Sequence, residues 1–346
     1  MSKYNAKITK LPKSSVSIEA EIDATIFESY REKAVKHMGE HLEVDGFRKG
    51  KAPEAVILKH IPEMAILEEM ANDAIADHYI KILEEEKIDA IGRPEVTITK
   101  IAKDNPLSFK ITTATVPEVT LPDYKKIAKK EGKKVEVKIE EKEVADTLLT
   151  LRREHALRDK GPEFKREDLK DEDLPAEDDE FAKKLGAFEN VAGLKTKIEE
   201  NIKLEKEGHE REKNRLTIIE AILKDTKIEI PDLLVESELD KMLYKMESDI
   251  TSMGLGFDDY LTHLKKSKED LRNEFRADAE KRATIEMVIH EIAKTEKIVP
   301  DAEAVKKEVA HILDMYKDAD PTRAQVYVET LMISQEVWKL LENQGE

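Results

Sequence analysis

Cysteine is absent from this chain of 346 residues. The fold therefore depends on neither disulfide bonds nor thiolate metal sites, and no thiol can act as a catalytic nucleophile. A chain without cysteine suits a reducing compartment such as the cytosol.

Long apolar runs are lacking as well. No stretch reaches the length of about 18 apolar residues that a membrane-spanning helix needs. The segment Met1–Lys7 is polar and lacks the apolar core of a signal peptide. We therefore expect a cytoplasmic protein that does not bind membranes.

Glycine and proline are scarce, with 12 residues of each, whereas 39% of the residues are charged. This composition favours long helices over a β-rich or disordered chain, and the length predicts two or three domains. The net charge of −17 argues against nucleic-acid binding by the whole surface. The acidity is uneven, because residues 1–112 carry 17 Lys and Arg against 20 Asp and Glu. This end is therefore the less repelled by a phosphate-rich partner.

Residues 1–116 have the patterns of a compact α+β domain. Apolar and polar residues alternate from Val16 to Asp23, which is typical of a half-buried strand. The patterns that follow predict helices over 25–43 and 53–60, a further apolar helical stripe from Met64, and strands over 95–101 and 107–115.

The remainder of the chain has mostly helical patterns. Residues 117–160 predict an extended linker, a short strand over 134–139 and a helix over 141–157. Residues 161–185 form an acidic connector, which we expect to be a solvated, mobile joint. Residues 186–346 predict a helical domain with paired arms. We therefore predict an elongated, multi-domain protein: an α+β N-terminal domain, then a mostly α-helical domain with long antiparallel helical arms.

The stretch from Asp45 to Pro53 is the most distinctive part of the sequence. Gly46 can end the preceding helix with a positive φ, and Pro53 suits the first turn of the next. These roles leave an aromatic and two cationic residues between the glycines unexplained, namely Phe47, Arg48 and Lys49. An exposed aromatic ring among cations is typical of a docking site for an RNA-rich or acidic partner.

The eight residues from Gly46 to Pro53 resemble the signature loop of trigger factor, the bacterial chaperone that sits at the ribosomal exit tunnel. The order strand, helix, loop, helix, strand, strand also matches that family's ribosome-binding domain. The resemblance implies a ribosome contact through Phe47, Arg48 and Lys49, in a loop shaped by Gly46, Gly50, Lys51 and Pro53.

The resemblance also implies a function. It predicts an ATP-independent chaperone without a cofactor, whose partners are ribosomal protein and rRNA near the exit tunnel and nascent or unfolded chains. Homodimerisation of the free protein stays open. The family's isomerase domain, expected near the acidic connector, is missing, so we predict that the chain is not an enzyme. The alternative is a ribosome-independent holdase or assembly scaffold of the same fold.

Six of the ten methionines fall in the helical part, and we consider them candidate client-binding residues: Met242, Met246, Met253, Met287, Met315 and Met332. Methionine is pliable and polarizable, so a surface that carries several can adapt to varied apolar partners. The alternative is that these side chains only fill gaps between helices.

One metal-binding pattern is present. His37, Glu40 and His41 match H-x-x-E-H, in which two histidines one turn apart bind zinc and the glutamate acts as a base. Gly39 inside the helix and the lack of a third ligand weaken this reading. We therefore assign no catalytic residue and no metal ligand, and interpret the pattern as a solvated helix end.

Overall fold

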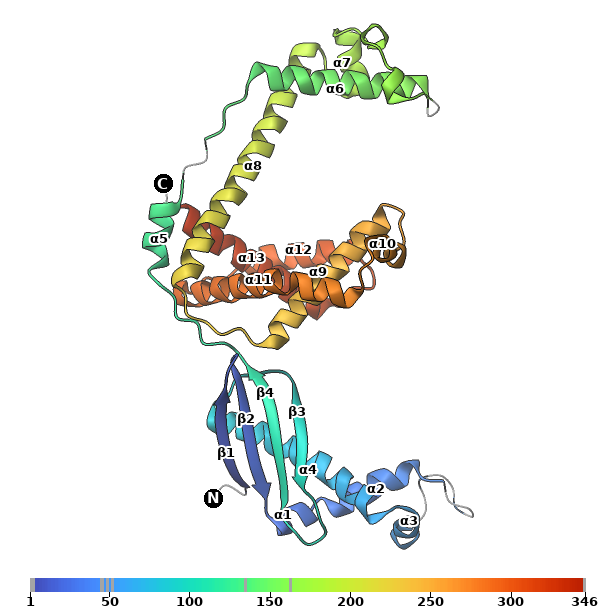
Figure 1. The fold of residues 1–346 in the computed structure, drawn as a ribbon, viewed down its shortest axis with the longest axis vertical. Helices are drawn as coiled ribbons and strands as arrows, with labels where there is room; N and C mark the ends of the chain where they lie inside the picture. Colours follow the sequence, from blue (N-terminus) through green and yellow to red (C-terminus); the bar gives the residue numbers. More distant parts are fainter. Residues whose placement is uncertain are drawn as a thin grey trace. The chain divides into compact units, whose positions relative to one another are not determined.

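The structure is a computed structural model that describes residues 4–43, 47, 50, 53–133, 136–161 and 164–344. The chain divides into two compact units. Unit 1 comprises Met1–Thr120 and Thr226–Glu291, and unit 2 comprises Leu121–Asp225 and Ile292–Glu346. Figure 1 shows the elements of both. The four-segment division predicted from the sequence stays a prediction.

Unit 1 contains an antiparallel sheet in the order β1-β2-β4-β3. Its strands are β1 (Tyr4–Leu11), β2 (Ser15–Ile22), β3 (Ala90–Lys100) and β4 (Leu107–Thr115). Ile18 on β2 pairs with Ile111 on β4, and both side chains are fully buried. The alternation predicted for β2 is confirmed, whereas the sequence patterns missed β1.

The two edges of the sheet differ in regularity. β1 pairs with β2 without interruption, and β3 pairs with β4 with a shift in register between Ile91 and Glu95. Pro94 lies inside that irregularity. Such a bulge bends the strand locally and interrupts its ladder of hydrogen bonds.

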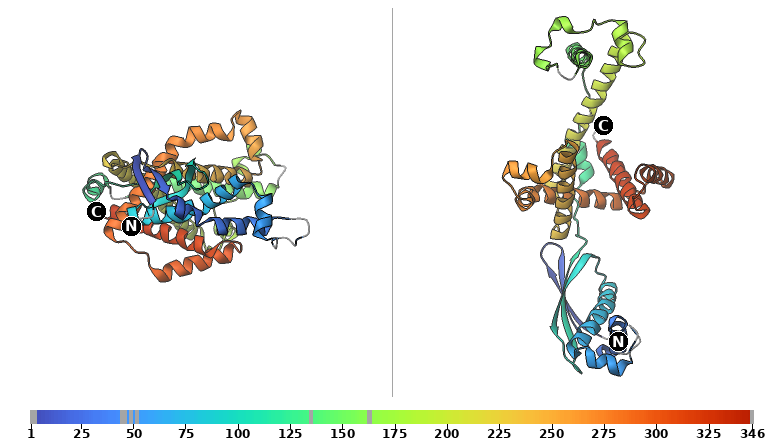
Figure 2. Two further views of the ribbon diagram at one scale, coloured as in Figure 1. Left: turned by 90° about the horizontal axis from the view of Figure 1, so that it is seen from below. Right: turned by 90° about the vertical axis from the view of Figure 1, so that its right-hand side faces the viewer.

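Helices cover one face of the sheet, as the right-hand view of Figure 2 shows. The helices of this part are α1 (Ala24–Glu28), α2 (Arg31–His41), α3 (Glu54–His60) and α4 (Glu63–Glu86). In Figure 1, α4 runs along the sheet, whereas α2 and α3 extend beyond it. The helix predicted over 25–43 is therefore interrupted at Ser29 and Tyr30. The buried face of α4 includes Ile66, Met70 and Ala74, which pack in the same core as the sheet. The predicted α+β N-terminal part is confirmed.

The rest of unit 1 is helical. It contains α9 (Asp232–Ser252), α10 (Phe257–Leu264) and the greater part of α11 (Lys268–Glu296). Val235 and Leu239 of α9 pack with Ala279 and Ala283 of α11, because alanine allows the two helices to approach closely. Gly254, at φ 79°, separates α9 from α10, as the sequence predicted.

All secondary-structure elements in the described part of unit 2 are helical. Its elements are α5 (Tyr124–Glu131), α6 (Glu141–Lys160), the 3-10 turns η1 (Arg166–Asp168) and η2 (Asp171–Asp173), α7 (Asp179–Leu185), α8 (Val191–Asp225), α12 (Ala302–Met315) and α13 (Pro321–Glu342). The strand predicted over 134–139 is wrong for residues 136–139, which form no strand. Residues 134 and 135 lie outside the described part of the chain. Among the described residues, no helix is long and apolar enough to cross a membrane.

The acidic connector is folded where we expected a solvated joint. Phe181 of α7 is only 2% exposed and packs with Leu148 of α6 and Leu194 and Ile198 of α8. The N-cap Asp178 accepts a hydrogen bond from the backbone N–H of Phe181 at 2.9 Å. The expectation fails at Phe181 and Ala182, because acidic side chains here cap helices and so let a few apolar residues form a core. The described side chains of residues 164–180 are exposed or half-buried, as expected. We call α6, α7 and the first turns of α8 the connector core.

Candidate functional site

The basic loop lies between α2 and α3. The ring of Phe47 is 43% exposed, although an aromatic side chain of this size is normally buried. The other predicted contact residues, Arg48 and Lys49, lie outside the described residues, as do Gly46 and Lys51. Their roles stay predictions.

Gly50 lies on the return side of this loop. Its φ of 72° belongs to the left-handed region, and a Cβ at this position would lie 3.1 Å from the carbonyl oxygen of Glu40. Both facts favour glycine here. Pro53 follows, and its carbonyl oxygen accepts hydrogen bonds from the backbone N–H groups of Val56 and Ile57 at 2.8 and 3.1 Å. Pro53 therefore caps α3.

The glycine inside the H-x-x-E-H pattern has a packing reason. A Cβ on Gly39 would lie 2.5 Å from Cδ1 of Ile57, so glycine allows α2 to pack closely against α3. His37 Nδ1 lies 2.6 Å from Oε1 of Glu69 on α4. The side chain of His41 is not described. No group of three or more His, Asp or Glu side chains that could hold a metal is found in the described part of the chain.

The six methionines fall into two groups. Met242 and Met287 pack against the core between α9 and α11, and Met246 packs against the core around α10. In these positions they fill gaps between helices. Met253 and Met315 are 76% and 60% exposed. The last of the six, Met332, lines a groove of about 670 Å³ on unit 2.

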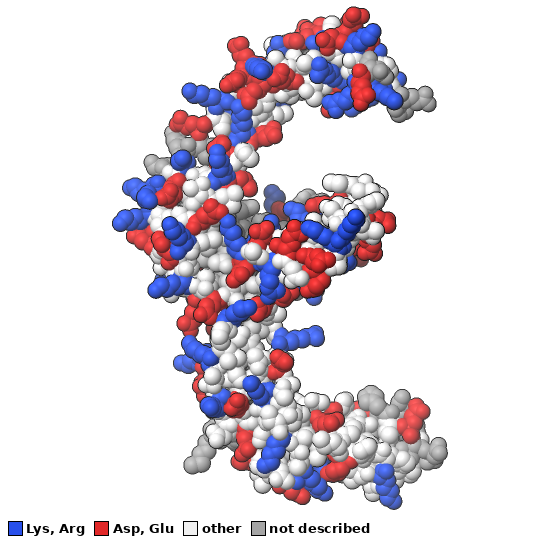
Figure 3. All heavy atoms as spheres, viewed as in Figure 1, with Lys and Arg blue, Asp and Glu red and all other residues white. Residues whose placement is uncertain are grey.

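Further exposed apolar residues surround Met253 in the sequence. We call four residues near the α9–α10 junction the apolar tip: Tyr244, Met253, Leu255 and Leu264. Tyr244 is as exposed as Met253, at 76%. Figure 3 shows side chains without charge gathered near α10, whereas opposite charges are intermixed over most of the visible face. Of these four residues, only Met253 was predicted from the sequence to bind clients, since an apolar helical residue is more often part of a core.

Unit 2 carries a second set of exposed apolar residues. We call it the α12–α13 face, and it comprises Val299, Met315, Tyr316, Val326, Tyr327 and Leu331. Val299 also lines the groove that Met332 lines, with Ile298, Pro300 and Leu340 among its other apolar walls and Gln335 and Lys339 among its polar ones. Such a surface can bind apolar segments without selecting a particular shape.

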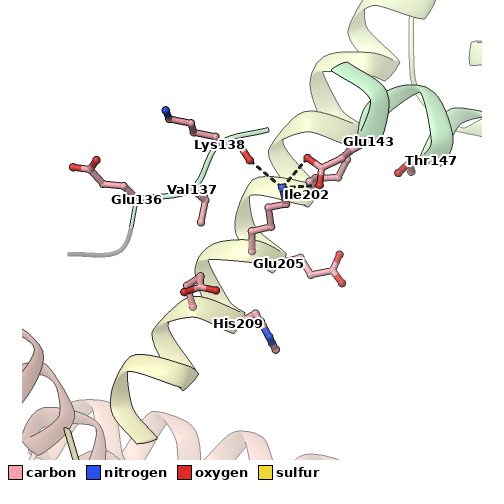
Figure 4. A pocket seen from close by; sticks show the side chains of 10 residues that line it. Glu136, Val137, Lys138, Glu143, Thr147, Ile202, Glu205 and His209 are labelled. Carbon is pink, nitrogen blue, oxygen red and sulfur yellow. Dashed lines mark hydrogen bonds and ion pairs between the residues drawn. The ribbon is translucent and has the colours of Figure 1, made fainter. Parts of the chain in front are cut away.

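A hollow of about 640 Å³ lies between residues 136–138 and α8, at the start of α6 (Figure 4). Lys206 Nζ donates to the carbonyl oxygen of Lys138 at 2.9 Å and to Oε2 of Glu143 at 2.7 Å. The backbone N–H of Glu140 and the Lys206 ammonium keep the pKa of Glu143 below its usual value. This amine therefore holds residues 136–140 against α8, and the contact is structural.

Comparison with known proteins identifies the family. The model described as bacterial trigger factor protein matches residues 4–151, and the model of the trigger factor C-terminus matches residues 190–344. A trigger factor of Clostridium botulinum, strain Langeland, is 26% identical over an alignment of 430 positions, gaps included. The alignment covers 99% of each chain. The trigger factor of Carboxydothermus hydrogenoformans is 26% identical over an alignment of 392 positions, gaps included. This alignment covers 90% of this chain and 91% of the relative.

A solved structure shares the fold. It belongs to a study of promiscuous substrate recognition in the folding and assembly activities of the trigger factor chaperone. The TM-score is 0.56 at 20% sequence identity, and the match covers 98% of this chain and 100% of the other.

Only residues 152–189 lie between the two family matches. This interval is shorter than a typical domain of about 50 residues or more, so the middle isomerase domain is absent. The two models together match most of the chain, and the family supports a chaperone role. The chain belongs to the trigger factor family.

Proposed function

We propose that this chain is an ATP-independent, cytoplasmic chaperone that docks at the ribosomal exit tunnel through the loop of Phe47, Arg48 and Lys49. There it shields the apolar segments of nascent chains. The exposed ring of Phe47, in a family of chaperones, is the observation that carries the docking part of the proposal. A protein without such a role would gain stability by burying that ring.

The apolar tip and the α12–α13 face support the client-binding part. Their side chains leave apolar surface open to water, which costs free energy unless a partner covers it. Several weak apolar contacts on one flexible client add up through effective concentration. A client that folds buries its own apolar segments and so releases these contacts, which explains why no nucleotide is needed.

Co-sedimentation with vacant ribosomes tests the docking. The parent protein is compared with a triple variant, Phe47→Ala, Arg48→Ala and Lys49→Ala. Central aromatic and arginine anchors often contribute about 2 kcal/mol or more each, so the triple variant should lose detectable binding. A matched control, Lys7→Ala with Lys110→Ala, removes two positive charges from the open face of the sheet in the same unit.

The control should bind ribosomes like the parent protein. Equal binding by the triple variant and the parent would refute docking through this loop. If the parent itself does not bind ribosomes but still suppresses client aggregation, the chain is a ribosome-independent holdase of the same fold.

We also propose that the chain lacks prolyl isomerase activity. The support is the absent middle domain, which in the family holds the isomerase pocket. In a protease-coupled assay with a short X-Pro peptide, the chain should leave the slow cis–trans step at its uncatalysed rate. Acceleration comparable to that of an isomerase would contradict the proposal.

A further inference from the structure

We propose that the turn between β1 and β2 is an electrostatic latch, which holds the sheet domain of unit 1 on the start of α9 and can open without unfolding either part. The turn comprises Pro12, Lys13 and Ser14. Lys13 and Ser14 both have positive φ angles, 58° and 46°, which side chains other than glycine rarely adopt. Short hairpin turns commonly require positive φ angles, and this turn joins the paired residues Leu11 and Ser15.

The turn faces the segment that leads into α9. The backbone N–H of Lys13 donates to Oε2 of Glu229 at 2.8 Å, and its ammonium group donates to Asp232 at 2.9 Å. The hydroxyl of Ser14 donates to the carbonyl oxygen of Glu229 at 2.8 Å. The turn therefore directs three donors at two acidic residues that lie more than 200 positions away in the sequence.

Two further contacts accompany the latch. A Cβ on Gly92 would lie 2.4 Å from Cδ2 of Leu233, so the backbone of β3 meets that side chain directly. Thr120, after the last strand, exchanges two backbone hydrogen bonds with Lys227, at 2.9 and 3.2 Å. The sequence predicted an extended linker over this part, and Thr120 forms an isolated bridge within it.

The charges on α9 and α11 allow the latch to open. Asp232 is shared, because Arg276 of α11 also donates to it at 2.9 Å. Hydrogen bonds from Lys13 first, and then from Arg276, keep the pKa of Asp232 below its usual value. Arg276 also pairs with Glu236 at 2.5 Å. When Lys13 withdraws, Asp232 therefore keeps a cationic partner and the α9–α11 pair stays intact.

The latch is accessible to solvent. The side chains of Lys13 and Asp232 are 60% and 52% exposed, so dissolved ions screen their attraction. The inference does not depend on ribosome binding. The latch therefore holds the sheet of unit 1 and the helices bearing the apolar tip together more tightly at low salt than at high salt, where the contacts of Gly92 and Thr120 remain.

Because the chain has no cysteine, spin labels can be placed at will. Two exposed positions, Thr97→Cys on β3 and Lys245→Cys on α9, report the distance across the latch by pulsed electron resonance. At about 0.01 M salt, where the Debye length is about 30 Å, the labelled parent should give one narrow distance distribution. At about 1 M salt, where it is about 3 Å, the distribution should broaden.

Lys13→Met combined with Ser14→Ala should give the broad distribution already at low salt. Lys7→Met, which removes the same charge from β1, is the control and should keep the narrow one. Circular dichroism and the thermal midpoints of all variants should match the parent, which separates opening of the latch from unfolding. A narrow distribution in the latch variant, or a broad one in the parent at low salt, would overturn the inference.

Discussion

The connector core allows one sharp prediction, because a single side chain fills much of it. Phe181 is 2% exposed, and its ring lies edge-on to that of His155 with 5.6 Å between the centroids. Truncation of a buried phenylalanine to alanine costs about 3 to 5 kcal/mol, and an aromatic pair adds about 0.5 to 1.5 kcal/mol. We expect Phe181→Ala to destabilise the connector core by at least about 3 kcal/mol.

Hydrogen exchange measured by mass spectrometry localises this effect. A free-energy change of about 1.4 kcal/mol corresponds to a factor of ten in the equilibrium constant for opening. Protected amides of α6, α7 and the start of α8 should therefore exchange at least about 100-fold faster in the variant than in the parent protein. Amides of the sheet in unit 1, whose core does not include Phe181, should keep the rates of the parent protein.

The matched control is Phe164→Ala, in the same connector. Phe164 is only half-buried, lies outside the connector core and meets the Lys160 ammonium 4.6 Å from its ring centroid. An exposed cation–π contact is worth about 0.5 to 1 kcal/mol, so this variant should change exchange by less than about tenfold. If the amides of the connector core exchange no faster in Phe181→Ala than in Phe164→Ala, the connector is not held by an apolar core and the reasoning is refuted.

Three further predictions concern other parts of the chain. Gly50→Ala should lower the free energy of unfolding by about 1 to 2 kcal/mol in urea titrations, because its φ is positive, whereas Gly208→Ala in an open helical position should be neutral or stabilising. Hydrogen bonds from Arg272 and then Arg276 keep the pKa of Glu236 below its usual value. The stability that this provides is present above the unfolded-state pKa of about 4.3 and is lost as the pH falls through the lower folded-state value. Arg272→Met should therefore flatten the acid side of a stability–pH curve, and an unchanged curve would contradict this. Replacing the whole apolar tip by serine should weaken suppression of client aggregation while the thermal midpoint stays constant, and undiminished suppression would remove the tip from the client-binding surface.

Local patterns predicted much of the fold. The alternation in β2 and the stripe on α4 are strong because one face of each is buried, and both were found where the sequence placed them. β1 was missed, since an edge strand with only partly buried residues such as Ile8 has a weak pattern. The connector was misjudged because charge dominates its composition, whereas burial of Phe181 depends on partners in α6 and α8 that are distant in sequence.

The candidate site was less predictable than the fold. The sequence singled out Phe47 by its neighbours, and its ring is exposed. Sequence could not separate Met242, which packs in a core, from Met253, which does not, because both lie at apolar helical spacings. It also gave no sign that Lys13 and Asp232 meet, since no local pattern records a contact between distant segments.

The irregular edge strand β3 has a consequence for a protein that meets unfolded chains. An open strand edge is a template on which an extended polypeptide can add by backbone hydrogen bonds, the first step of co-aggregation. Pro94 lacks the N–H such pairing requires, and the shift between Ile91 and Glu95 spoils the spacing of the neighbouring groups. Addition of an extended polypeptide along this edge is thereby disfavoured around Pro94.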